Sequence, residues 1–175
     1  MKKLNIWCWT DIKPDYLNRD IIQLPGVDKV YDFEKFPYPF EDNTFKEIYC
    51  SHVLEHMNDL GKVMEEFTRI GKNGCQIKVK VPYFASPNAW GDYTHKRTFN
   101  LNSFNYFTPD HYYNSAKIIT LNKKIHYFSN YAFLKSEGVN KIFDFLINIF
   151  PSIYERFFAY RFPAVEIHYL LEVKK

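Results

Sequence analysis

The sequence predicts an α/β protein that forms one domain around a mostly parallel sheet with an antiparallel C-terminal edge. The chain has 175 residues, a length that fits one domain with a real core. Its composition, 46% hydrophobic and 25% charged, is that of an ordinary globular domain. Strand-like segments dominate both ends, and helical patterns separate them. The order of the expected elements suggests that the late strands form an antiparallel, hairpin-like edge.

Four strands are expected in the first third of the chain. Short apolar runs bounded by turn residues mark them at residues 4–8, 16–22, 27–33 and 45–53. Too few residues separate the first two strands for a full crossover helix, so this helix is shortened or missing. The proline-punctuated stretch "FPYPFEDNT" predicts a loop and a turn before the fourth strand.

A surface helix is expected to start at a cap on Asn58 or Asp59 and to end near Ile70. Its apolar residues recur with helical spacing and predict a buried face. These residues are Leu60, Val63, Met64, Phe67 and Ile70. The polar residues expected to face solvent are Lys62, Glu65, Glu66 and Arg69. "GKNG" then stops the helix and makes a turn, and the alternating "CQIKVKVPY" predicts a fifth strand.

The second half of the chain begins with a long segment of little periodicity. Residues 84–114 are rich in aromatic and polar side chains, which is typical of a substrate or lid loop. A strand over 116–128, a helix over 140–158 bent near Pro151 and a strand over 164–175 complete the chain. We therefore expect a single domain over residues 1–175.

Charge and cysteine content exclude several classes of protein. The net charge of +3 comes from dispersed lysines, so nucleic acid is not demanded as a partner. Cys8, Cys50 and Cys75 are odd in number and lack a CxxC pair, which argues against a disulfide framework or a structural zinc site. A reducing, cytoplasmic location is expected. The apolar runs are too short for a secretory signal or a transmembrane segment.

Two blocks resemble a known family. They are "DFEKFPYPFEDNTFKEIYCSHVLEHMNDLGKVMEEFTRIGKNG" and "VPYFASPNAWGDYTHKRTF". The first is similar to the "PF.D..FD.I...HVLEH" block and the "R.LKPGG" helix end of class I S-adenosylmethionine-dependent methyltransferases, in particular the short methyltransferase type 11 domains. The resemblance runs from residue 4 to about residue 107. It implies a Rossmann-like methyltransferase sheet, S-adenosylmethionine as cofactor, and methyl transfer to a small or saccharide-like acceptor.

The resemblance also implies a set of cofactor-binding residues. An acidic residue at the end of the second strand, here Asp20, accepts the ribose hydroxyls. A second acidic residue near the adenine maps to Asp32, with Phe33 beside it as a stacking face. Ser51 and His52 lie at the carboxyl end of the fourth strand, where open α/β sheets present ligands. The alternative for each aspartate is a cap or turn former.

The family's first motif, "N.GCG", appears in this chain as "NIWCW", so that Trp7, Cys8 and Trp9 occupy the cofactor turn. A bulky residue is unfavourable where glycine would adopt a positive φ. Two alternatives stay open. If Trp7 and Trp9 share one face of a strand, they fill the gap left by the missing helix and Cys8 faces the site. Otherwise they fill the cofactor pocket, and the chain is a binding or partner protein that has lost the cofactor.

"GDYTHKRTF" follows the fifth strand, where a methyl acceptor would meet the methyl group. His95 is the candidate general base, with Asp92 beside it, because the pKa of histidine lies near neutrality. Lys96 or Arg97 would hold an anionic group of the acceptor, and Tyr93 would contact it. The alternative is a well-packed lid without a chemical role.

Residues 52–56, "HVLEH", also spell the H-x-x-E-H motif of inverted zincins. That motif needs a helix, whereas this stretch spans the end of a strand and the beginning of a helix. We therefore expect no metal here, and a hydrogen-bond cluster at Glu55 and His56 instead.

The helical segment 139–162 has too many aromatic residues for one narrow stripe. Most are expected in the core or in a homodimer surface, and a peripheral membrane contact is the alternative. The residues to test are Phe143, Phe150, Phe157 and Phe158.

Overall fold

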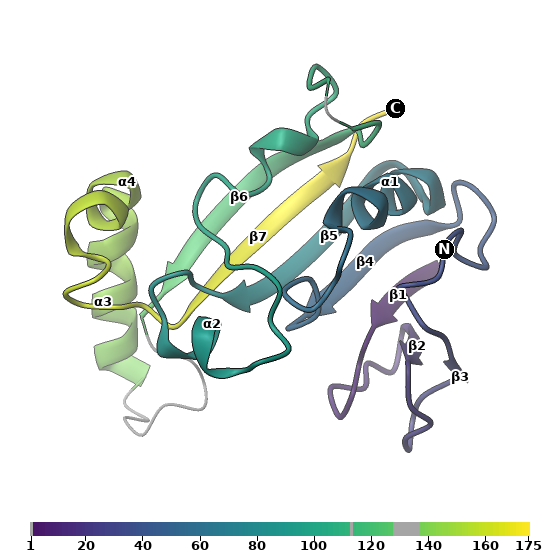
Figure 1. The fold of residues 1–175 in the computed structure, drawn as a ribbon, viewed down its shortest axis with the longest axis horizontal. Coiled ribbons are helices and arrows are strands. Elements are labelled where there is room, and N and C mark those ends of the chain that lie inside the picture. Colours follow the sequence, from purple (N-terminus) through teal and green to yellow (C-terminus); the bar gives the residue numbers. More distant parts are fainter. Residues whose placement is uncertain (1, 113, 128–136) are drawn as a thin grey trace.

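A computed structural model describes residues 2–112, 114–127 and 137–175 of the chain. Within these residues, seven strands form one sheet in the order β3-β2-β1-β4-β5-β7-β6 (Figure 1). The strands are β1 (Lys2–Ile6), β2 (Leu17–Asp20), β3 (Lys29–Val30), β4 (Phe45–Ser51), β5 (Gly71–Pro82), β6 (Ile118–His126) and β7 (Glu166–Val173). β7 is antiparallel to both β5 and β6, and the other pairs are parallel. The predicted mixed sheet is confirmed.

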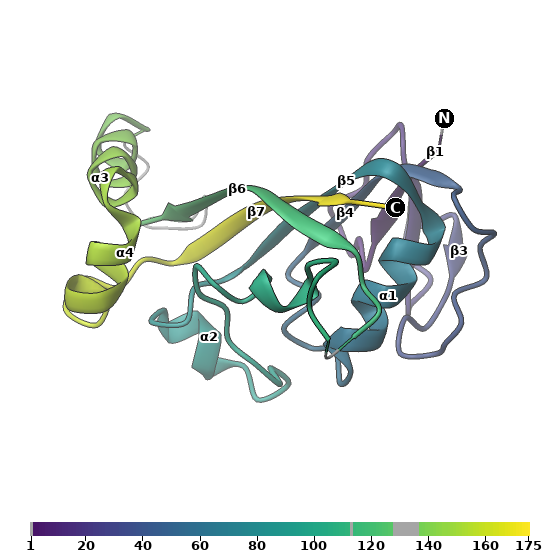
Figure 2. The same cartoon turned by 90° about the horizontal axis from the view of Figure 1, so that it is seen from above.

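The helices lie mainly on one side and at one end of this sheet. They are α1 (Leu60–Ile70), α2 (Pro87–Gly91), the 3-10 turn η1 (Asn105–Phe107), α3 (Glu137–Ile149), α4 (Pro151–Ile153) and the π turn η2 (Tyr154–Phe158). Figure 2 shows α1 and α2 on the same side of the sheet, with α3 and α4 at its far end. Residues 7–16, between β1 and β2, form turns and no helix, which confirms the shortened first crossover.

Helix α1 packs as its sequence pattern predicts. Asp59 caps the helix, because its side chain accepts a hydrogen bond of 3.0 Å from the backbone N–H of Lys62. Val63, Met64 and Phe67 are fully buried against the sheet in the main core cluster. These contacts fix α1 on the sheet, and its N-terminus follows directly after the residues that end β4.

The long segment between β5 and β6 is packed instead of open. Phe99, Leu101 and Phe104 are buried in the core cluster, and Tyr83 forms an isolated parallel bridge with Phe99. The segment contains α2 and η1, two short helical turns that the aperiodic sequence does not predict. Its first part is thereby held over the carboxyl edge of the sheet.

The aromatic segment near the C-terminus is largely exposed. Pro151 does break it, since α3 ends at Ile149 and α4 starts at Pro151, as predicted. The four candidate phenylalanines are all exposed, so of the two expected places, core or homodimer surface, the core does not hold them and the homodimer surface stays a prediction. They are Phe143, Phe150, Phe157 and Phe158, with exposed fractions of 40%, 65%, 67% and 48%. Among the described residues, none of the helices is long and apolar enough to cross a membrane.

Candidate active site at the carboxyl edge of the sheet

The turn after β1 keeps a backbone that suits glycine although it carries two indoles. β1 ends at Ile6, so Trp7, Cys8 and Trp9 all lie beyond the strand. Trp7 has φ of +48° and Trp9 has φ of +37°, in the left-handed region that glycine favours. The two tryptophans therefore do not share a face of a strand, and the expectation based on strand alternation is wrong.

The two indoles have different surroundings. Trp9 is 71% exposed, whereas Trp7 is half-buried against the core, with its ring centroid 6.0 Å from that of His56. Trp7 Nε1 is buried and has no hydrogen-bond partner among the described residues. Cys8 is buried, and burial followed by the charge of Asp20 raises the pKa of its thiol to about 11. The thiol is therefore neutral near pH 7.

Substitution of each tryptophan by glycine is expected to change stability in opposite directions. Trp9→Gly relieves the strained φ and removes little buried surface, so we expect the free energy of unfolding to rise by about 1 kcal/mol. Trp7→Gly relieves similar strain but removes a half-buried indole, so a net loss of about 2 kcal/mol is expected. Urea unfolding of both variants measures the two values. Equal losses in the two variants would contradict this assignment.

Asp20 holds the tryptophan turn against the end of β2. Its Oδ2 accepts a hydrogen bond of 2.8 Å from the backbone N–H of Trp9. Its Oδ1 accepts one of 3.1 Å from the backbone N–H of Ile22. The side chain is buried, and each carboxylate oxygen keeps a further lone pair. Asp20 thus has the turn-forming role that we weighed as its alternative, and it retains acceptor capacity for a ligand.

The two residues expected at the adenine have different surroundings. Asp32 is half-buried, and its Oδ1 accepts a hydrogen bond of 3.0 Å from the backbone N–H of Glu34. Phe33 is fully buried, with its ring centroid 5.2 Å from those of both Tyr31 and Tyr38. The Phe33 ring offers no open face, so the stacking role that we expected for it does not fit this structure.

The end of β4 presents a charged histidine. Ser51 is the last residue of β4, and His52 follows with φ of +55°. His52 Nε2 lies 3.4 Å from Glu166 Oε1, and Nδ1 lies 3.3 Å from Glu55 Oε1. Contacts with the carboxylates of Glu166 and Glu55 outweigh burial and raise the pKa of His52 to about 9. His52 is therefore protonated near neutral pH.

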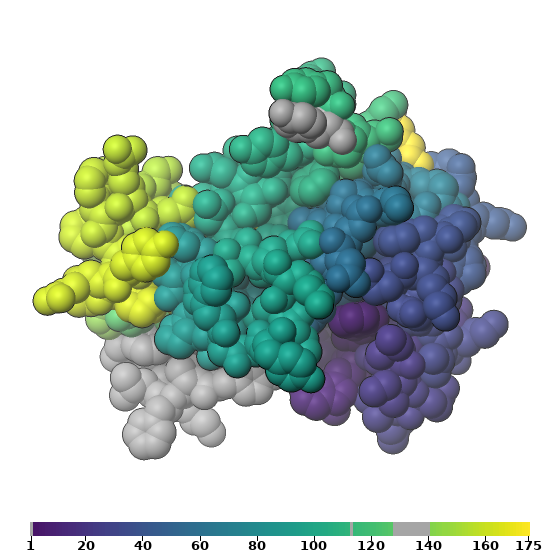
Figure 3. Space-filling view, in the orientation of Figure 1, coloured from purple at the N-terminus to yellow at the C-terminus, as the bar shows by residue number. Residues whose placement is uncertain are grey.

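The loop after β5 folds back onto the residues that follow β4. The backbone N–H of Lys96 donates a hydrogen bond of 2.7 Å to the carbonyl of Glu55. Arg97 Nη2 donates one of 2.9 Å to the carbonyl of Asn58. The rings of His56 and His95 meet edge to face, with centroids 4.7 Å apart. Figure 3 shows a recess between the purple N-terminal segment and the teal segment that contains this loop.

The predicted loop residues do not all turn toward this edge. Tyr93 is 96% exposed and Lys96 is exposed. Asp92 forms a turn, since its Oδ1 accepts hydrogen bonds from the backbone N–H and the hydroxyl of Thr94, at 2.8 and 2.6 Å. His95 is largely buried, with Nδ1 3.1 Å from the carbonyl oxygen of Ala89 and Nε2 3.8 Å from Asp92 Oδ2.

Sequence reasoning missed two of the residues that meet at this edge, Thr94 and Glu166. Glu55 and His56 were expected to form only a local hydrogen-bond cluster, and Thr94 and Glu166 were not singled out. Glu166 lies at the start of the antiparallel strand β7, far from His52 in sequence. The only signal in the sequence was the H-x-x-E-H spacing of residues 52–56, and no spacing rule connects that motif to Glu166.

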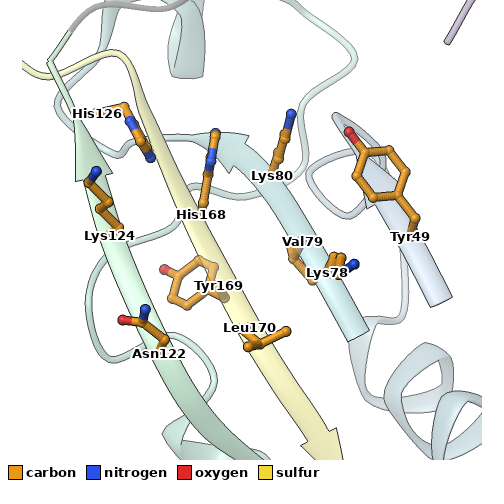
Figure 4. A pocket seen from close by; sticks show the side chains of 10 residues that line it. All are labelled: Tyr49, Lys78, Val79, Lys80, Asn122, Lys124, His126, His168, Tyr169 and Leu170. Atoms are coloured by element: carbon orange, nitrogen blue, oxygen red, sulfur yellow. The ribbon is translucent and has the colours of Figure 1, made fainter. Parts of the chain in front are cut away.

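A cavity of about 320 Å³ lies on the face of the sheet opposite α1 (Figure 4). Its lysines, Lys78, Lys80 and Lys124, come from β5 and β6, and His126 and His168 lie side by side with ring centroids 4.1 Å apart. Burial, followed by the charge of His168, lowers the pKa of His126. Glu166 links this cavity to the carboxyl edge, because its Oε2 lies 3.0 Å from His168 Nε2 and its Oε1 faces His52.

Comparison with known proteins identifies the class of this architecture. Residues 9–78 match the family described as methyltransferase domain. The structure resembles YcgJ from Bacillus subtilis, with a TM-score of 0.61, 15% identity, and coverage of 99% of this chain and 92% of that chain. A comparison with curated protein sequences finds no match.

Two further solved structures show the same fold. A SAM-dependent methyltransferase from Archaeoglobus fulgidus has a TM-score of 0.59 and 17% identity, with coverage of 98% of this chain and 85% of that chain. An S-adenosylmethionine-dependent methyltransferase from Mesorhizobium loti has a TM-score of 0.56 and 10% identity, with coverage of 98% and 90%. The chain therefore has the Rossmann-like methyltransferase fold.

Residues 9–78 thus match a methyltransferase family, and the described part of the chain has the fold of solved S-adenosylmethionine-dependent methyltransferases.

Proposed function

We propose that this chain binds S-adenosylmethionine at the turn after β1 and methylates a hydroxyl or amine of a small or saccharide-like acceptor. The observation that carries the proposal is the contact between the loop after β5 and the residues after β4. Lys96 N–H bonds to Glu55, and His95 packs on His56, which in turn lies against Trp7 of the cofactor turn. Methyl transfer needs mainly the orientation of two reactants and the exclusion of water, which such an edge supplies.

Several features of the turn fit the cofactor. When bound, S-adenosylmethionine supplies the methyl group as an electrophile. The N–H groups of Trp9 and Ile22 each occupy one lone pair of the Asp20 carboxylate. The remaining lone pairs would accept hydrogen bonds from the ribose hydroxyls. The exposed Trp9 indole leaves the backbone of the turn accessible. Trp7 Nε1 is a buried donor without a partner in the described residues, and an acceptor atom of the ligand would satisfy it.

The acceptor is proposed to lie against the loop after β5. Arg97 supports this assignment because its Nε is buried without a hydrogen-bond partner in the described part of the chain, which leaves a donor for an anionic group of the acceptor. His95 and Asp92 are proposed to act on the acceptor's proton, with Lys96 and Tyr93 at the exposed rim of the site.

Calorimetry with S-adenosylmethionine and S-adenosylhomocysteine tests the proposal. We expect saturable binding in the micromolar range, followed by release of S-adenosylhomocysteine when a panel of hydroxyl and amine acceptors is supplied. A folded protein that gives no heat at millimolar ligand would instead support the alternative, a methyltransferase-like binding or partner protein. This alternative stays open because tryptophan occupies both positions where the family motif has glycine.

We further propose that the exposed aromatic face of α3, α4 and η2 pairs with a second copy of the chain. Phe150 and Phe157 are each exposed by about two thirds, which is unusual for large aromatic side chains on a monomer. Light scattering should give the mass of a dimer, and Phe150→Ser combined with Phe157→Ser should give that of a monomer. A monomer that binds anionic vesicles would support peripheral membrane contact instead.

A further inference from the structure

We propose that Glu55, His56 and His95 form a binding site for one divalent transition-metal ion. Each residue offers one ligand atom, and these atoms lie within 4.8 Å of one another. The three side chains come from two segments, the residues after β4 and the loop after β5, which the Lys96–Glu55 backbone hydrogen bond holds together at 2.7 Å. The site is therefore assembled by the fold and is not a single sequence motif.

The state of Glu55 is the observation that calls for a cation. Glu55 is only 1% exposed, yet neither of its carboxylate oxygens has a hydrogen-bond partner among the described residues. In the part of the chain that the structure describes, the protonated His52 faces Oε1, with its Nδ1 at 3.3 Å, and Oε2 has no charged partner. A buried carboxylate oxygen without a hydrogen bond is costly unless a charge compensates it. A metal ion bound to the carboxylate would supply that compensation at Oε2.

In both His56 and His95 the hydrogen bond is made by Nδ1, so Nε2 is the nitrogen that could bind a metal ion. His95 Nδ1 lies 3.1 Å from the carbonyl oxygen of Ala89, a group that can only accept, so Nδ1 carries the proton. His56 Nδ1 lies 2.9 Å from Thr94 Oγ1, and the Thr94 hydroxyl donates to Asp92 Oδ1. His56 Nδ1 is therefore also the protonated nitrogen. Metal-binding histidines commonly donate their second nitrogen to a carbonyl or a similar acceptor in this way.

The donor set indicates which metal ions are suitable. Two imidazole nitrogens and one carboxylate oxygen suit Zn²⁺ or Mn²⁺, and they do not suit ions that need an all-oxygen shell. Three protein ligands leave at least one coordination position open, as in catalytic sites. His52 is not in this set, so the site differs from the H-x-x-E-H motif, in which both histidines would be ligands.

The open coordination position suggests how the metal ion would take part in the proposed methyl transfer, and this step rests on that proposed function. His56 lies beside Trp7 of the cofactor turn, with ring centroids 6.0 Å apart, so a hydroxyl group at the open coordination position would lie on the side of the proposed cofactor site. Coordination lowers the pKa of a hydroxyl, and its proton passes to water. Methyl transfer to that oxygen would form the carbon–oxygen bond as the carbon–sulfur bond of the cofactor breaks, and it would yield a methyl ether and S-adenosylhomocysteine. The acceptor would be a hydroxyl compound. A metal-bound His95 cannot also take up the proton, so this step replaces the general-base role proposed for His95 above.

Metal binding by the full chain tests the site without any activity measurement. Protein stripped with a chelator is titrated with Zn²⁺ and with Mn²⁺ by calorimetry, and metal content after dialysis is measured by elemental analysis. We expect about one equivalent, with affinity at least about 100-fold weaker in His95→Ala and in the isosteric Glu55→Gln. His52→Ala is the matched control and should still bind one equivalent, since His52 is outside the proposed set.

Three outcomes separate this inference from its competitors. Wild-type protein that binds less than about a tenth of an equivalent overturns the site. Binding that is lost in His52→Ala and kept in His95→Ala overturns it in favour of the H-x-x-E-H arrangement. Binding of S-adenosylhomocysteine is measured separately, so a protein that binds metal without this ligand refutes the proposed function and supports the metal site. Glu55→Gln keeps the readout available if His95→Ala fails to fold.

Discussion

Asp20→Ala is expected to weaken the binding of S-adenosylhomocysteine by at least about 100-fold, since charge-assisted hydrogen bonds contribute about 1.5–3 kcal/mol each. The carboxylate would lose its bonds to the ribose. It also orders the turn, because its two oxygens accept the backbone N–H groups of Trp9 and Ile22 at 2.8 and 3.1 Å. Unpairing these donors should lower the free energy of unfolding by about 2 kcal/mol. Calorimetry and urea unfolding measure the two effects.

A matched variant separates loss of the ligand from loss of the turn. Asp28 also uses its carboxylate to hold backbone, since its Oδ2 accepts a hydrogen bond of 2.6 Å from the N–H of Asn18. Asp28→Ala should therefore cost a similar amount of stability while S-adenosylhomocysteine binds as in the wild type. If both variants lose the ligand equally, the effect of Asp20 is structural and the ribose assignment fails.

The sequence predicts the parts of the fold that follow from local periodicity. Helix α1 begins after the expected cap Asp59 and ends at Ile70, and its apolar spacing correctly predicts that Val63 and Phe67 are buried. The strand order and the antiparallel strand β7 agree with the resemblance to the methyltransferases. The end of the first strand was misplaced, because "LNIWCW" is apolar at every position except Asn5 and gives no sign that a left-handed turn begins at Trp7.

The candidate site was only partly predictable, because its geometry depends on tertiary contacts. The sequence pointed to His95 and to the H-x-x-E-H spacing as separate features. It could not show that the rings of His56 and His95 meet edge to face. Thr94, which neighbours His95, bonds to His56 across 38 residues of sequence. Nor could it show that Phe33, which follows the expected adenine-binding aspartate, has its ring enclosed by Tyr31 and Tyr38.

Helix α1 also shows where periodicity misleads. The pattern places Glu66 and Arg69 on the solvent face, but Arg69 bonds to the proline-rich loop before β4, and that prediction is wrong. Its Nη1 donates to the carbonyl of Phe40 at 2.8 Å, and its Nη2 donates to the carbonyl of Tyr38 at 2.9 Å. Glu66 holds the same guanidinium through bonds of 2.8 and 2.7 Å. A helical wheel cannot distinguish solvent from a loop that packs over the helix.

Arg69→Ala is therefore expected to lower the free energy of unfolding by about 3 kcal/mol, because two loop carbonyls and the Glu66 carboxylate lose their partner together. The side chain is 28% exposed, and this partial contact with water keeps the loss below that of a fully buried pair. Arg69→Lys should recover less than half of it, since an ammonium group cannot match the forked geometry of the guanidinium. Urea unfolding of both variants gives the values.

Lys62→Ala is the control, because it removes only an exposed ion pair with Asp59 at 3.8 Å. It should change the free energy of unfolding by less than about 1 kcal/mol. If Arg69→Ala costs no more than Lys62→Ala, the loop is held by its aromatic packing on Phe67 and not by the guanidinium, whose bonds would then be replaceable by water.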